Sequence, residues 1–390
     1  MNILILPSWY PDNDNPINGV FFQEQAEALY NYFQVNKINA SVTVFAFNVM
    51  SIKSIGKFLK SKKTLYKTHE NGIDVWRLNY INLFPKMPFI ALPVAVKIFK
   101  KQLETIQNIE KLKFDIVHIH SALNAGIFYS LANISLPYII TEHATFYARD
   151  LINTYQKRYL KNVFDNAKQI FVVGKGLMPY IQTYTKNRID ILFNIVKQRC
   201  VKIATDEDKK NFRFFSLGLG YYKKGFDVLI KAFAKVSVHI HDVELYIAGL
   251  NDDEKNILLK LALELNIPEN QLRLFGPLSR EDVSLQMNMC DCFCLLSRFE
   301  TFGVVYAEAL YYGKPIIGSK TGGPDSFCTD EVGLIVDIDD VEASAEALMH
   351  VYTHRDLYNA DSIKRYAKEN FSENVIAEKL YTTYMNVLHC

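Results

Sequence analysis

The sequence predicts an α/β protein with two doubly wound domains, each holding a parallel sheet between layers of helices. Apolar, strand-like runs alternate with amphipathic helical patterns almost from end to end, which is typical of βαβ units. The alternation begins a second time at "FRFFSLG", after a break near 192–200. The chain has 390 residues, of which 49% are hydrophobic, so two or three domains with a large buried core are expected.

The first domain is expected to span residues 1–195. Its strands are predicted at "NILIL", "SVTVFAF", "FDIVHIH", "LPYIIT" and "KQIFVVG", and a helix at "GVFFQEQAEALYNYF" follows the first of them. The region from 51 to 67 lies between the second and third of these strands and is expected to be irregular. The amphipathic last helix, 372–390, is expected to cross back and pack on this domain.

The second domain is expected to span residues 196–371. Its strands are predicted at "FRFFSLG", "DVELYIAG", "QLRLFG", "CDCFCLLS" and "GLIVDI", with helices at "GFDVLIKAFAKV" and "DDEKNILLKLALEL". Ser279 and Asp282 resemble a capping box that starts a further helix. Cys290, Cys292 and Cys294 alternate along one strand, which indicates buried thiols on one face rather than a zinc site, because zinc ligands usually lie further apart.

The totals exclude several functional classes. The formal net charge is only +2, so nothing points to nucleic acid as a partner. No run of about 18 apolar residues occurs, so no spanning helix is expected. The start "MNILILP" lacks the basic region of a signal peptide, and the unpaired cysteines suit a reducing compartment. A cytoplasmic protein is expected.

The stretch "CLLSRFETFGVVYAEALYYGKPIIGSKTGGP" carries the strongest functional signal. Glu300 and Glu308 flank a Phe-Gly turn at a helix start, at the carboxyl end of a strand, where ligands bind in open α/β sheets. Gly303 permits close approach of the backbone, and the helix N-terminus favours an anion. Carboxylates do not bind an anion, so the two acids are expected to hold hydroxyl groups on either side of it. This describes a nucleotide-sugar, although an exposed loop acid and an ordinary helical Glu remain the alternative for this segment alone.

A lysine provides a second phosphate partner. In "FSLGLGYYKKGFDVLI" the pattern Gly218-Leu219-Gly220 follows a strand, but it completes neither a dinucleotide fingerprint nor a P-loop. Lys224 lies just before a helix, where it could meet a phosphate as a point charge.

In the first domain, two features accompany the same edge of the sheet. Gly19 ends the long loop after the first strand and could close over the ligand. His143 follows the strand "LPYIIT" at its carboxyl end, where catalytic groups collect. His118 is expected to be a core residue with satisfied hydrogen bonds, whereas His120 could reach the site.

These segments resemble a known family. "SRFETFGVVYAEALYYGKPIIGSKTGGP" is similar to the Glu-x7-Glu signature of the retaining glycosyltransferases of family 4, and the likeness extends over nearly the whole chain. The resemblance implies a GT-B fold, in which two Rossmann-like domains face each other across a cleft. The first would bind the acceptor and the second the nucleotide-sugar donor.

The resemblance also implies roles for residues. Glu300 would bind hydroxyls of the transferred sugar and, with His143, is the expected catalytic residue. Glu308 would hold the nucleotide ribose, and backbone N–H groups near the helix start would meet the sugar and diphosphate. The implied donor-binding residues are Gly19, Lys224, Phe302, Gly303, Val304 and Glu308. The family uses no metal or other cofactor besides the nucleotide-sugar co-substrate, and its proposed chemistry is front-face transfer with retention of configuration.

Two details bear on this assignment. The family usually has an arginine where this chain has Leu219, so a second cation at the diphosphate is missing or comes from elsewhere, for example Arg280 or Arg298. Asp12-Asn13-Asp14 resembles the Asp-x-Asp metal motif of another glycosyltransferase fold, but turn chemistry accounts for it better.

A basic segment indicates contact with a membrane. Residues 51–67 contain six lysines and no acid, and on a helix Ile52, Ile55 and Leu59 would lie opposite several of them. Such a helix can rest on an anionic surface, although a solvated helix or loop is an equal alternative. The lysines expected at the membrane are Lys53, Lys57, Lys60, Lys62 and Lys63.

The leading hypothesis is a metal-independent hexosyltransferase that moves a sugar from a nucleotide diphosphate sugar to a hydroxyl of a surface-polysaccharide or lipid-linked glycan, as in lipopolysaccharide or capsule synthesis. A UDP-sugar is the expected donor, although the sequence leaves the base, sugar and acceptor open. The alternatives are a GT-B nucleotide-sugar epimerase and a non-catalytic protein that binds sugar nucleotides. The expected location is cytoplasmic and peripheral on the membrane.

Overall fold

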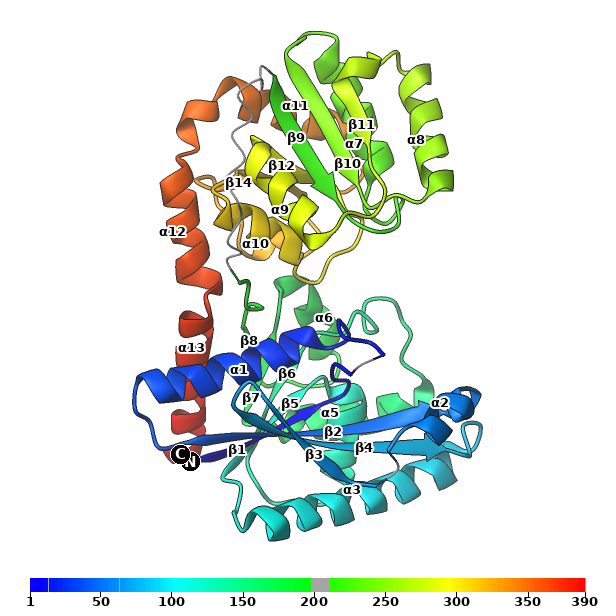
Figure 1. Cartoon of the computed structure of the whole chain (residues 1–390), viewed down its shortest axis with the longest axis vertical. Helices are drawn as coiled ribbons and strands as arrows, with labels where there is room; N and C mark the ends of the chain where they lie inside the picture. Colours follow the sequence, from blue (N-terminus) through cyan, green and yellow to red (C-terminus); the bar gives the residue numbers. More distant parts are fainter. Residues whose placement is uncertain (13, 63, 198–210, 390) are drawn as a thin grey trace. The chain divides into compact units, whose positions relative to one another are not determined.

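The computed structural model describes residues 1–12, 14–62, 64–197 and 211–389 (Figure 1). The chain divides into two compact units. The first comprises Met1–Val173, Leu177–Ile195 and Glu373–Cys390, and the second comprises Gly174–Gly176 and Val196–Ser372. Each unit is an α/β structure around its own sheet, so the predicted pair of doubly wound domains is confirmed.

The first unit holds an eight-stranded sheet with the order β3-β4-β2-β1-β5-β6-β7-β8. All neighbours are parallel except β3 and β4, which pair antiparallel. The strands are β1 (Asn2–Pro7), β2 (Ser41–Ser51), β3 (Tyr66–Glu70), β4 (Ile73–Asn82), β5 (Ile116–His120), β6 (Tyr138–Glu142), β7 (Gln169–Val172) and β8 (Ile189–Ile191). The helices are α1 (Val20–Val35), α2 (Ile55–Lys60), α3 (Pro88–Glu110), α4 (Ile127–Leu131), α5 (Thr154–Asp165), α6 (Met178–Gln182) and α13 (Glu373–His389).

The hairpin of β3 and β4 corrects the expectation of an irregular stretch up to Lys67. Asn71 and Gly72 link its strands, and both have positive φ, 49° and 87°. An Asn-Gly pair with this backbone is the usual connection in a tight hairpin. The stretch "ENG" is therefore the sequence signal that indicates this hairpin. The hairpin extends the sheet and places the end of β4 beside the end of β2, with Asn82 opposite Ser51.

The C-terminal helix α13 packs against α1 in the first unit (Figure 1). Its buried residues include Ile376, Leu380 and Tyr384, which join the core that contains Phe22 and Phe33. The Tyr384 hydroxyl lies 2.7 Å from Nδ1 of His118, and Nε2 of His118 lies 2.8 Å from the Thr141 hydroxyl. His118 is therefore a core residue with both ring nitrogens satisfied, as expected from the sequence.

The second unit holds a six-stranded parallel sheet with the order β11-β10-β9-β12-β13-β14. The strands are β9 (Phe212–Leu217), β10 (Val243–Ala248), β11 (Leu272–Leu274), β12 (Cys292–Leu295), β13 (Ile316–Ser319) and β14 (Gly333–Val336). The helices are α7 (Phe226–Ser237), α8 (Asp252–Glu264), α9 (Arg280–Met289), α10 (Val304–Tyr311), α11 (Val341–Thr353) and α12 (Ala360–Phe371). The strand order reverses between β9 and β12, and a doubly wound sheet binds its ligand at such a switch point.

The three cysteines near β12 are buried free thiols. Cys292 and Cys294 lie on the strand, but Cys290 caps the C-terminus of α9 instead of extending the strand. Burial raises the pKa of the Cys292 and Cys294 thiols, which keeps both groups neutral.

Candidate active site

Two loops meet at the switch point of the second sheet. One follows β9 and carries Lys224, and the other follows β12 and carries Glu300. The Lys224 ammonium forms an ion pair with the Glu300 carboxylate, and the two side chains are only 15% and 13% exposed. The Ser297 hydroxyl also lies 3.3 Å from the same carboxylate oxygen. The structure therefore brings together two predicted site residues that are 76 positions apart in the sequence.

Both loops end at helix N-termini without side-chain caps. Gly225 precedes α7 and Gly303 precedes α10, both with left-handed backbone. A Cβ at Gly225 would lie 1.8 Å from the Leu296 carbonyl oxygen, so the first loop is pressed against the end of β12. The first N–H groups of an α-helix lack partners within the helix and favour an anion. At α7 the Phe226 N–H donates to the Tyr221 carbonyl oxygen at 3.0 Å, and the N–H groups of Asp227 and Val228 donate to the Asp227 carboxylate. The start of α10 is therefore the one that suits an anion beside the Lys224–Glu300 pair.

The Gly-Gly-Pro turn supports the Glu300 loop from behind. A Cβ at Gly323 would lie 3.0 Å from Cβ of Glu300 and 3.1 Å from the Phe302 carbonyl oxygen, so only glycine fits there easily. The Phe302 ring is buried against Phe327 and Phe371. This packing anchors the loop and leaves the Phe302 side chain in the core, so a role at a ligand would fall to its backbone.

Glu308 lies one turn into α10 and is half-buried. It lines a small pocket together with Lys197 and Tyr312. Val304 is the first residue of α10, so Glu308 follows it on the same helix face.

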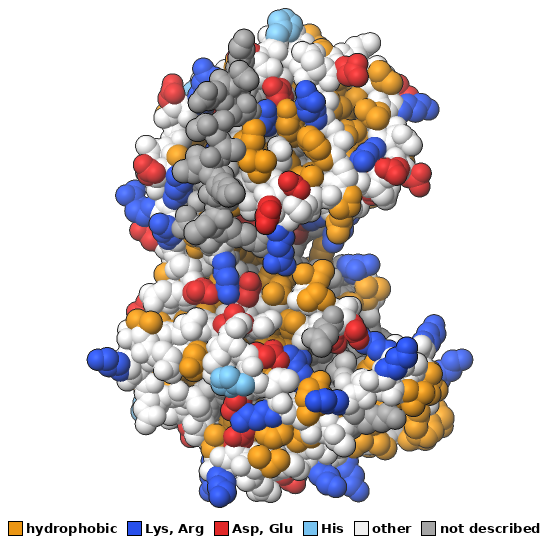
Figure 2. Space-filling model, viewed as in Figure 1, with side chains coloured by type: hydrophobic (Ala, Val, Ile, Leu, Met, Phe, Trp, Pro, Cys, Tyr) orange, Lys and Arg blue, Asp and Glu red, His pale blue; other side chains and the backbone are white. Residues whose placement is uncertain are grey.

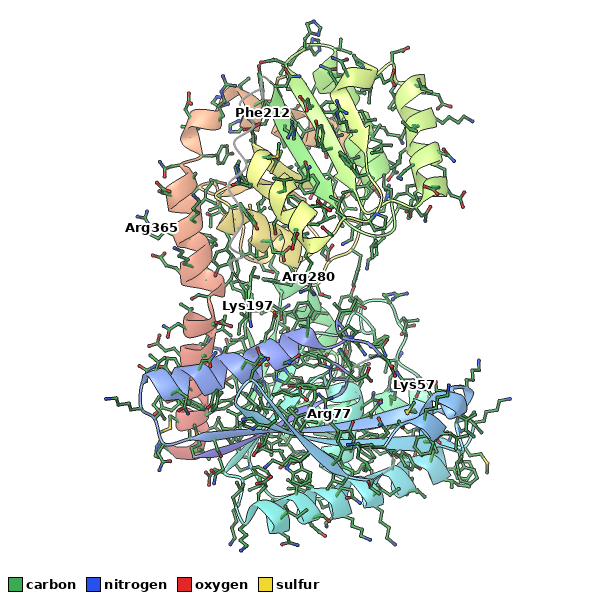
Figure 3. The ribbon with its side chains drawn as sticks, in the orientation of Figure 1. Lys57, Arg77, Lys197, Phe212, Arg280 and Arg365 are labelled. Atoms are coloured by element: carbon green, nitrogen blue, oxygen red, sulfur yellow. The ribbon has the colours of Figure 1, made fainter. Side chains whose placement is uncertain are left out.

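Arg298 is engaged within the second unit. Its guanidinium forms ion pairs with Asp227 at 2.8 Å and Asp339 at 2.7 Å and lies over the Tyr222 ring at 3.9 Å. Burial by itself would raise the pKa of Asp227, but the hydrogen bonds and charge of Arg298, together with backbone N–H donors, lower it. The arginine thus holds the loop after β9 in place, which argues against it as the missing diphosphate cation. Arg280 is exposed at the start of α9 (Figure 3), and Leu219 is 72% exposed.

In the first unit, His143 follows β6 beside His120. Nε2 of His143 lies 3.4 Å from Nδ1 of His120, and the Phe22 ring packs against both imidazoles with centroids 4.8 Å away. Burial lowers the pKa of His143 to about 3, although the neighbouring Asn194 side chain opposes this shift. His143 is therefore a neutral imidazole at physiological pH.

Gly19 precedes α1 with φ of 81°. A Cβ there would lie 2.8 Å from the Trp9 carbonyl oxygen, and the Trp9 ring packs on Phe22 at 5.3 Å. Gly19 and His143 are thus linked through Trp9 and Phe22 in one contiguous cluster at the carboxyl edge of the first sheet.

Glu142 is the residue that the sequence reasoning missed. Its fully buried carboxylate accepts hydrogen bonds from the N–H groups of Ala122, His143 and Ala144 and from the Tyr147 hydroxyl, at 2.9–3.0 Å. Burial raises the pKa of Glu142, and these hydrogen bonds counteract the shift. The carboxylate shapes the turn that carries His143. The one signal in the sequence was its place directly before that histidine.

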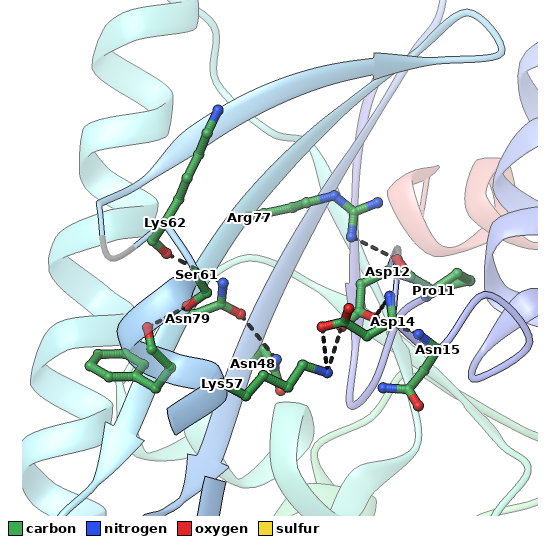
Figure 4. Close-up of polar contacts among 11 residues, drawn as sticks. Pro11, Asp12, Asp14, Asn15, Asn48, Lys57, Ser61, Lys62, Arg77 and Asn79 are labelled. Atoms are coloured by element: carbon green, nitrogen blue, oxygen red, sulfur yellow. Dashed lines mark hydrogen bonds and ion pairs between the residues drawn. The ribbon is translucent and has the colours of Figure 1, made fainter. Parts of the chain in front are cut away.

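The basic segment differs from the expectation in one respect. Lys57 does not join an exposed lysine face, because its ammonium pairs with Asp14 at 3.0 Å and Asp12 at 3.9 Å (Figure 4). Lys53, Lys60 and Lys62 are exposed, and Lys63 lies outside the described residues.

The short acidic loop after β1 forms a turn. One Asp12 carboxylate oxygen accepts from the N–H groups of Asp14 and Asn15, at 2.9 and 2.7 Å, as expected for turn chemistry. Asn13 lies outside the described residues. Over the part of the chain that the structure describes, no cluster of three or more His, Cys, Asp or Glu side chains could hold a metal ion. In that same part, no helix is long and apolar enough to cross a membrane.

The sequence matches two family models. Residues 64–197 match the model described as Glycosyltransferase Family 4, and residues 201–370 match the model described as Glycosyl transferases group 1. The chain is also 28% identical over 256 residues to an uncharacterized glycosyltransferase of Methanocaldococcus jannaschii, which covers 64% of this chain and 68% of that protein.

Solved structures share the fold over almost the whole chain. The lipopolysaccharide outer core galactosyltransferase WaaB, in its apo form, matches with a TM-score of 0.72 and 15% identity, covering 99% of both chains. Anabaena HepE in complex with UDP and glucose matches with a TM-score of 0.64 and 17% identity, covering 99% of this chain and 100% of that chain. At these identities the likeness shows the fold alone, which is the two-domain fold predicted from the sequence.

Proposed function

Because the chain belongs to the family 4, or group 1, glycosyltransferases with the GT-B fold, we propose that it transfers a hexose from a nucleotide diphosphate sugar to a hydroxyl of a glycan acceptor. UDP is the proposed nucleotide, which the bound UDP in the HepE complex supports by analogy. The proposed acceptor is a surface polysaccharide or lipid-linked glycan, in keeping with the lipopolysaccharide substrate in the name of WaaB.

The observation that carries the donor site is the Lys224–Glu300 pair at the switch point of the second sheet. A lysine that pairs with a carboxylate before the donor arrives can turn to the diphosphate when the donor binds, and it then frees Glu300 for sugar hydroxyls. The start of α10 would supply N–H groups for the same diphosphate, and both helix starts would supply positive dipole ends.

Each residue of the donor site would have a distinct role. Lys224 and the helix starts stabilise the charge that develops on the leaving diphosphate, which is why we propose that no metal is needed. Glu300 binds hydroxyls near the reacting carbon, and Glu308 holds the ribose. The backbone of Phe302, Gly303 and Val304 approaches the sugar and diphosphate through the N–H groups at the start of α10.

We propose that His143 binds near the transferred sugar and that Gly19 contributes to diphosphate binding. The neutral imidazole of His143 can accept or donate a hydrogen bond to a sugar hydroxyl without adding charge. The leaving phosphate takes up the acceptor proton in the proposed front-face reaction, so the new glycosidic bond forms as the sugar–phosphate bond breaks and the configuration is retained.

The proposed location is peripheral on the cytoplasmic membrane. Exposed apolar side chains gather at one end of the first unit, where Figure 2 shows an orange area edged by blue Lys or Arg side chains. The apolar residues are Ile52, Ile55, Leu59, Leu83, Phe84, Met87, Phe89 and Val94, all at least 40% exposed. They follow the adjacent ends of β2 and β4, and neither 51–69 nor 75–103 contains an acid. Apolar groups among uncompensated lysines suit an anionic lipid surface.

The decisive experiment measures nucleotide binding and turnover together. We expect UDP or a related diphosphate to raise the melting temperature of the wild type, because a ligand at 100 times its Kd adds about 2.7 kcal/mol. Glu308→Ala should lose that shift. Transfer to a glycan acceptor, followed by mass spectrometry, separates this proposal from its alternatives. An isomerised nucleotide-sugar would indicate an epimerase, and binding without any turnover would indicate a non-catalytic protein.

A further inference from the structure

A second cavity lies wholly within the first unit, with a volume of about 830 Å³. Its walls come from the loop after β1, the carboxyl halves of β2 and β4, and α2 with the segment after it. Lys57 and Arg77 project into this region from α2 and β4 (Figure 3). None of the residues assigned to the donor lines it, so it is a separate site.

The charges that line the cavity compensate one another. The lining residues include three cations, Lys57, Lys62 and Arg77, and three carboxylates, Asp12, Asp14 and Glu70. Nη2 of Arg77 donates to both carboxylate oxygens of Glu70, at 2.7 and 2.9 Å, and Nη1 donates to the Pro11 carbonyl oxygen at 2.8 Å. An anionic ligand would have to displace a carboxylate from its partner, at the cost of leaving that carboxylate uncompensated.

Lys57 adds the second compensated pair, with the Asp14 carboxylate at 3.0 Å (Figure 4). Lys62 is exposed at the edge, with its ammonium 4.8 Å from the Tyr66 ring centroid. Because its charges are paired, the cavity has no strong positive or negative electrostatic potential that would attract a charged ligand.

The remaining lining is rich in groups that recognise sugars. It includes five carboxamides and the aromatic rings of Trp9, Tyr10 and Tyr66. The Asn48 amide donates to Asn79 at 3.0 Å, which fixes two of the carboxamides (Figure 4). Tyr10 is only 8% exposed, and among the described residues its buried hydroxyl has no hydrogen-bond partner. A buried hydroxyl without a partner costs free energy that a bound ligand would recover.

We infer that this cavity binds an uncharged, hydroxyl-rich glycan, and that its paired charges select against sugars that carry carboxylates. The inference rests on the proposed function, since it assigns the acceptor of that reaction to neutral hexose or N-acetylhexosamine units. Aromatic faces stack on the apolar faces of such rings, while the amides, the Tyr10 hydroxyl and the paired carboxylates bind their hydroxyls. The cavity lining includes Ser51, Ser54 and Lys57, which are close in sequence to the exposed Ile52 and Leu59, and this suits a lipid-linked glycan.

The test compares neutral with acidic oligosaccharides on the full chain. The probes are trimers of glucose, galactose and N-acetylglucosamine and, as the acidic counterpart, a trimer of galacturonic acid, followed by saturation-transfer NMR. We expect a neutral trimer to bind more tightly than the acidic one. Tyr10→Phe and Asn79→Ala should each weaken the neutral trimer about three- to tenfold. Asn187→Ala, outside the cavity, is the matched control.

A variant with altered cavity charge tests the proposed selection against acidic sugars more directly. Asp14→Asn together with Glu70→Gln removes the nearer carboxylate partner of Lys57 and the carboxylate partner of Arg77, so the preference should shift towards galacturonate by about tenfold or more. Stabilisation by UDP in the same samples reports separately on the donor site. Preference of the wild type for galacturonate, no binding of any neutral trimer, or neutral binding that ignores Tyr10 and Asn79 would each overturn the inference while leaving the donor assignment untouched.

Discussion

At the scale of single residues, Lys224 offers the most direct test of the donor site. Its ammonium is largely buried beside Glu300, and charge-assisted contacts with a phosphate contribute about 1.5–3 kcal/mol. Lys224→Ala should therefore weaken UDP binding roughly tenfold to a hundredfold, measured by calorimetry. Lys223→Ala removes a neighbouring lysine whose ammonium lies near the Phe299 ring, 6.0 Å from its centroid, and should change the affinity little. Equal losses in both variants would mean that general positive charge, and not Lys224, binds the nucleotide.

Gly303 tests the turn that opens α10. Its φ of 81° is unfavourable for other residues, and a Cβ would lie 2.5 Å from the Tyr306 ring. Gly303→Ala should lower the free energy of unfolding by about 1–3 kcal/mol, measured by urea denaturation. Gly56→Ala is the matched control, because nothing lies within 4 Å of a Cβ there. A helical Gly→Ala change of this kind is neutral or stabilising by up to about 1 kcal/mol. Equal stability of the two variants would show that Gly303 is not constrained.

At the scale of elements, β5 carries His118 and His120 and the residue after β6 is His143, and the burial of these histidines makes stability depend on pH. Burial lowers the pKa of His118 and of His143 to about 3, against an ordinary value near 6.5. The unfolded chain therefore binds more protons between those values, so the free energy of unfolding falls as the pH drops from about 6.5 towards 3. Each histidine contributes at most about 1.4 kcal/mol per pH unit.

Urea denaturation between pH 7.5 and 5 measures this dependence. His143→Gln should give a shallower loss of stability than the wild type, and the exposed His239→Gln is the matched control. Because the raised pKa of Glu142 acts in the opposite direction, the comparison between variants is the readout. Identical slopes for wild type and His143→Gln would contradict the assignment of a buried neutral imidazole.

Elements also mark how far the sequence could predict the structure. Parallel strands such as Asn2–Pro7 and Cys292–Leu295 contain continuous apolar runs, because both faces of the sheet are buried, so the sequence predicts them directly. Tyr66–Glu70 is an edge strand that is rich in polar residues and alternates in exposure. The only signal in the sequence that predicts it is the Asn-Gly turn that follows. The strand order reverses between β9 and β12, which brings Lys224 to Glu300. Strand order is a property of the tertiary structure, so the local sequence pattern does not predict it.

The same limit applies to charged side chains. The spacing of lysines on α2 predicts an exposed basic face, but the turn that contains Asp12 and Asp14 lies next to that helix. Both carboxylates form ion pairs with Lys57. The sequence offers Arg298 as a candidate cation for the donor diphosphate. In the structure its guanidinium forms ion pairs with Asp227 and Asp339 instead. Spacing predicts which face a side chain joins, whereas its partner depends on segments distant in the sequence.

At the scale of the whole molecule, the proposal separates two activities: the second unit binds the nucleotide and the first binds the membrane and glycan. Full-length protein should co-sediment with vesicles that contain phosphatidylglycerol, less at high salt because screening weakens the lysine contribution. Replacing Leu59 and Phe89 by Ser should abolish sedimentation while UDP still raises the melting temperature. Conversely, Lys224→Ala should lose the UDP effect and still bind vesicles.

Val238→Ser with Leu263→Ser provides the matched control for lost hydrophobic exposure. Both residues are at least 67% exposed, but they lie in the second unit, away from the acid-free segments. This variant should sediment like the wild type. Replacing Lys53 and Lys60 by Ala should weaken binding by about 2 kcal/mol, since each lysine near an anionic surface contributes about 1 kcal/mol. If uncharged vesicles bind the protein as well as anionic ones, or if the Leu59 and Phe89 changes have no effect, the membrane face is wrong and the acceptor must reach the first unit from solution.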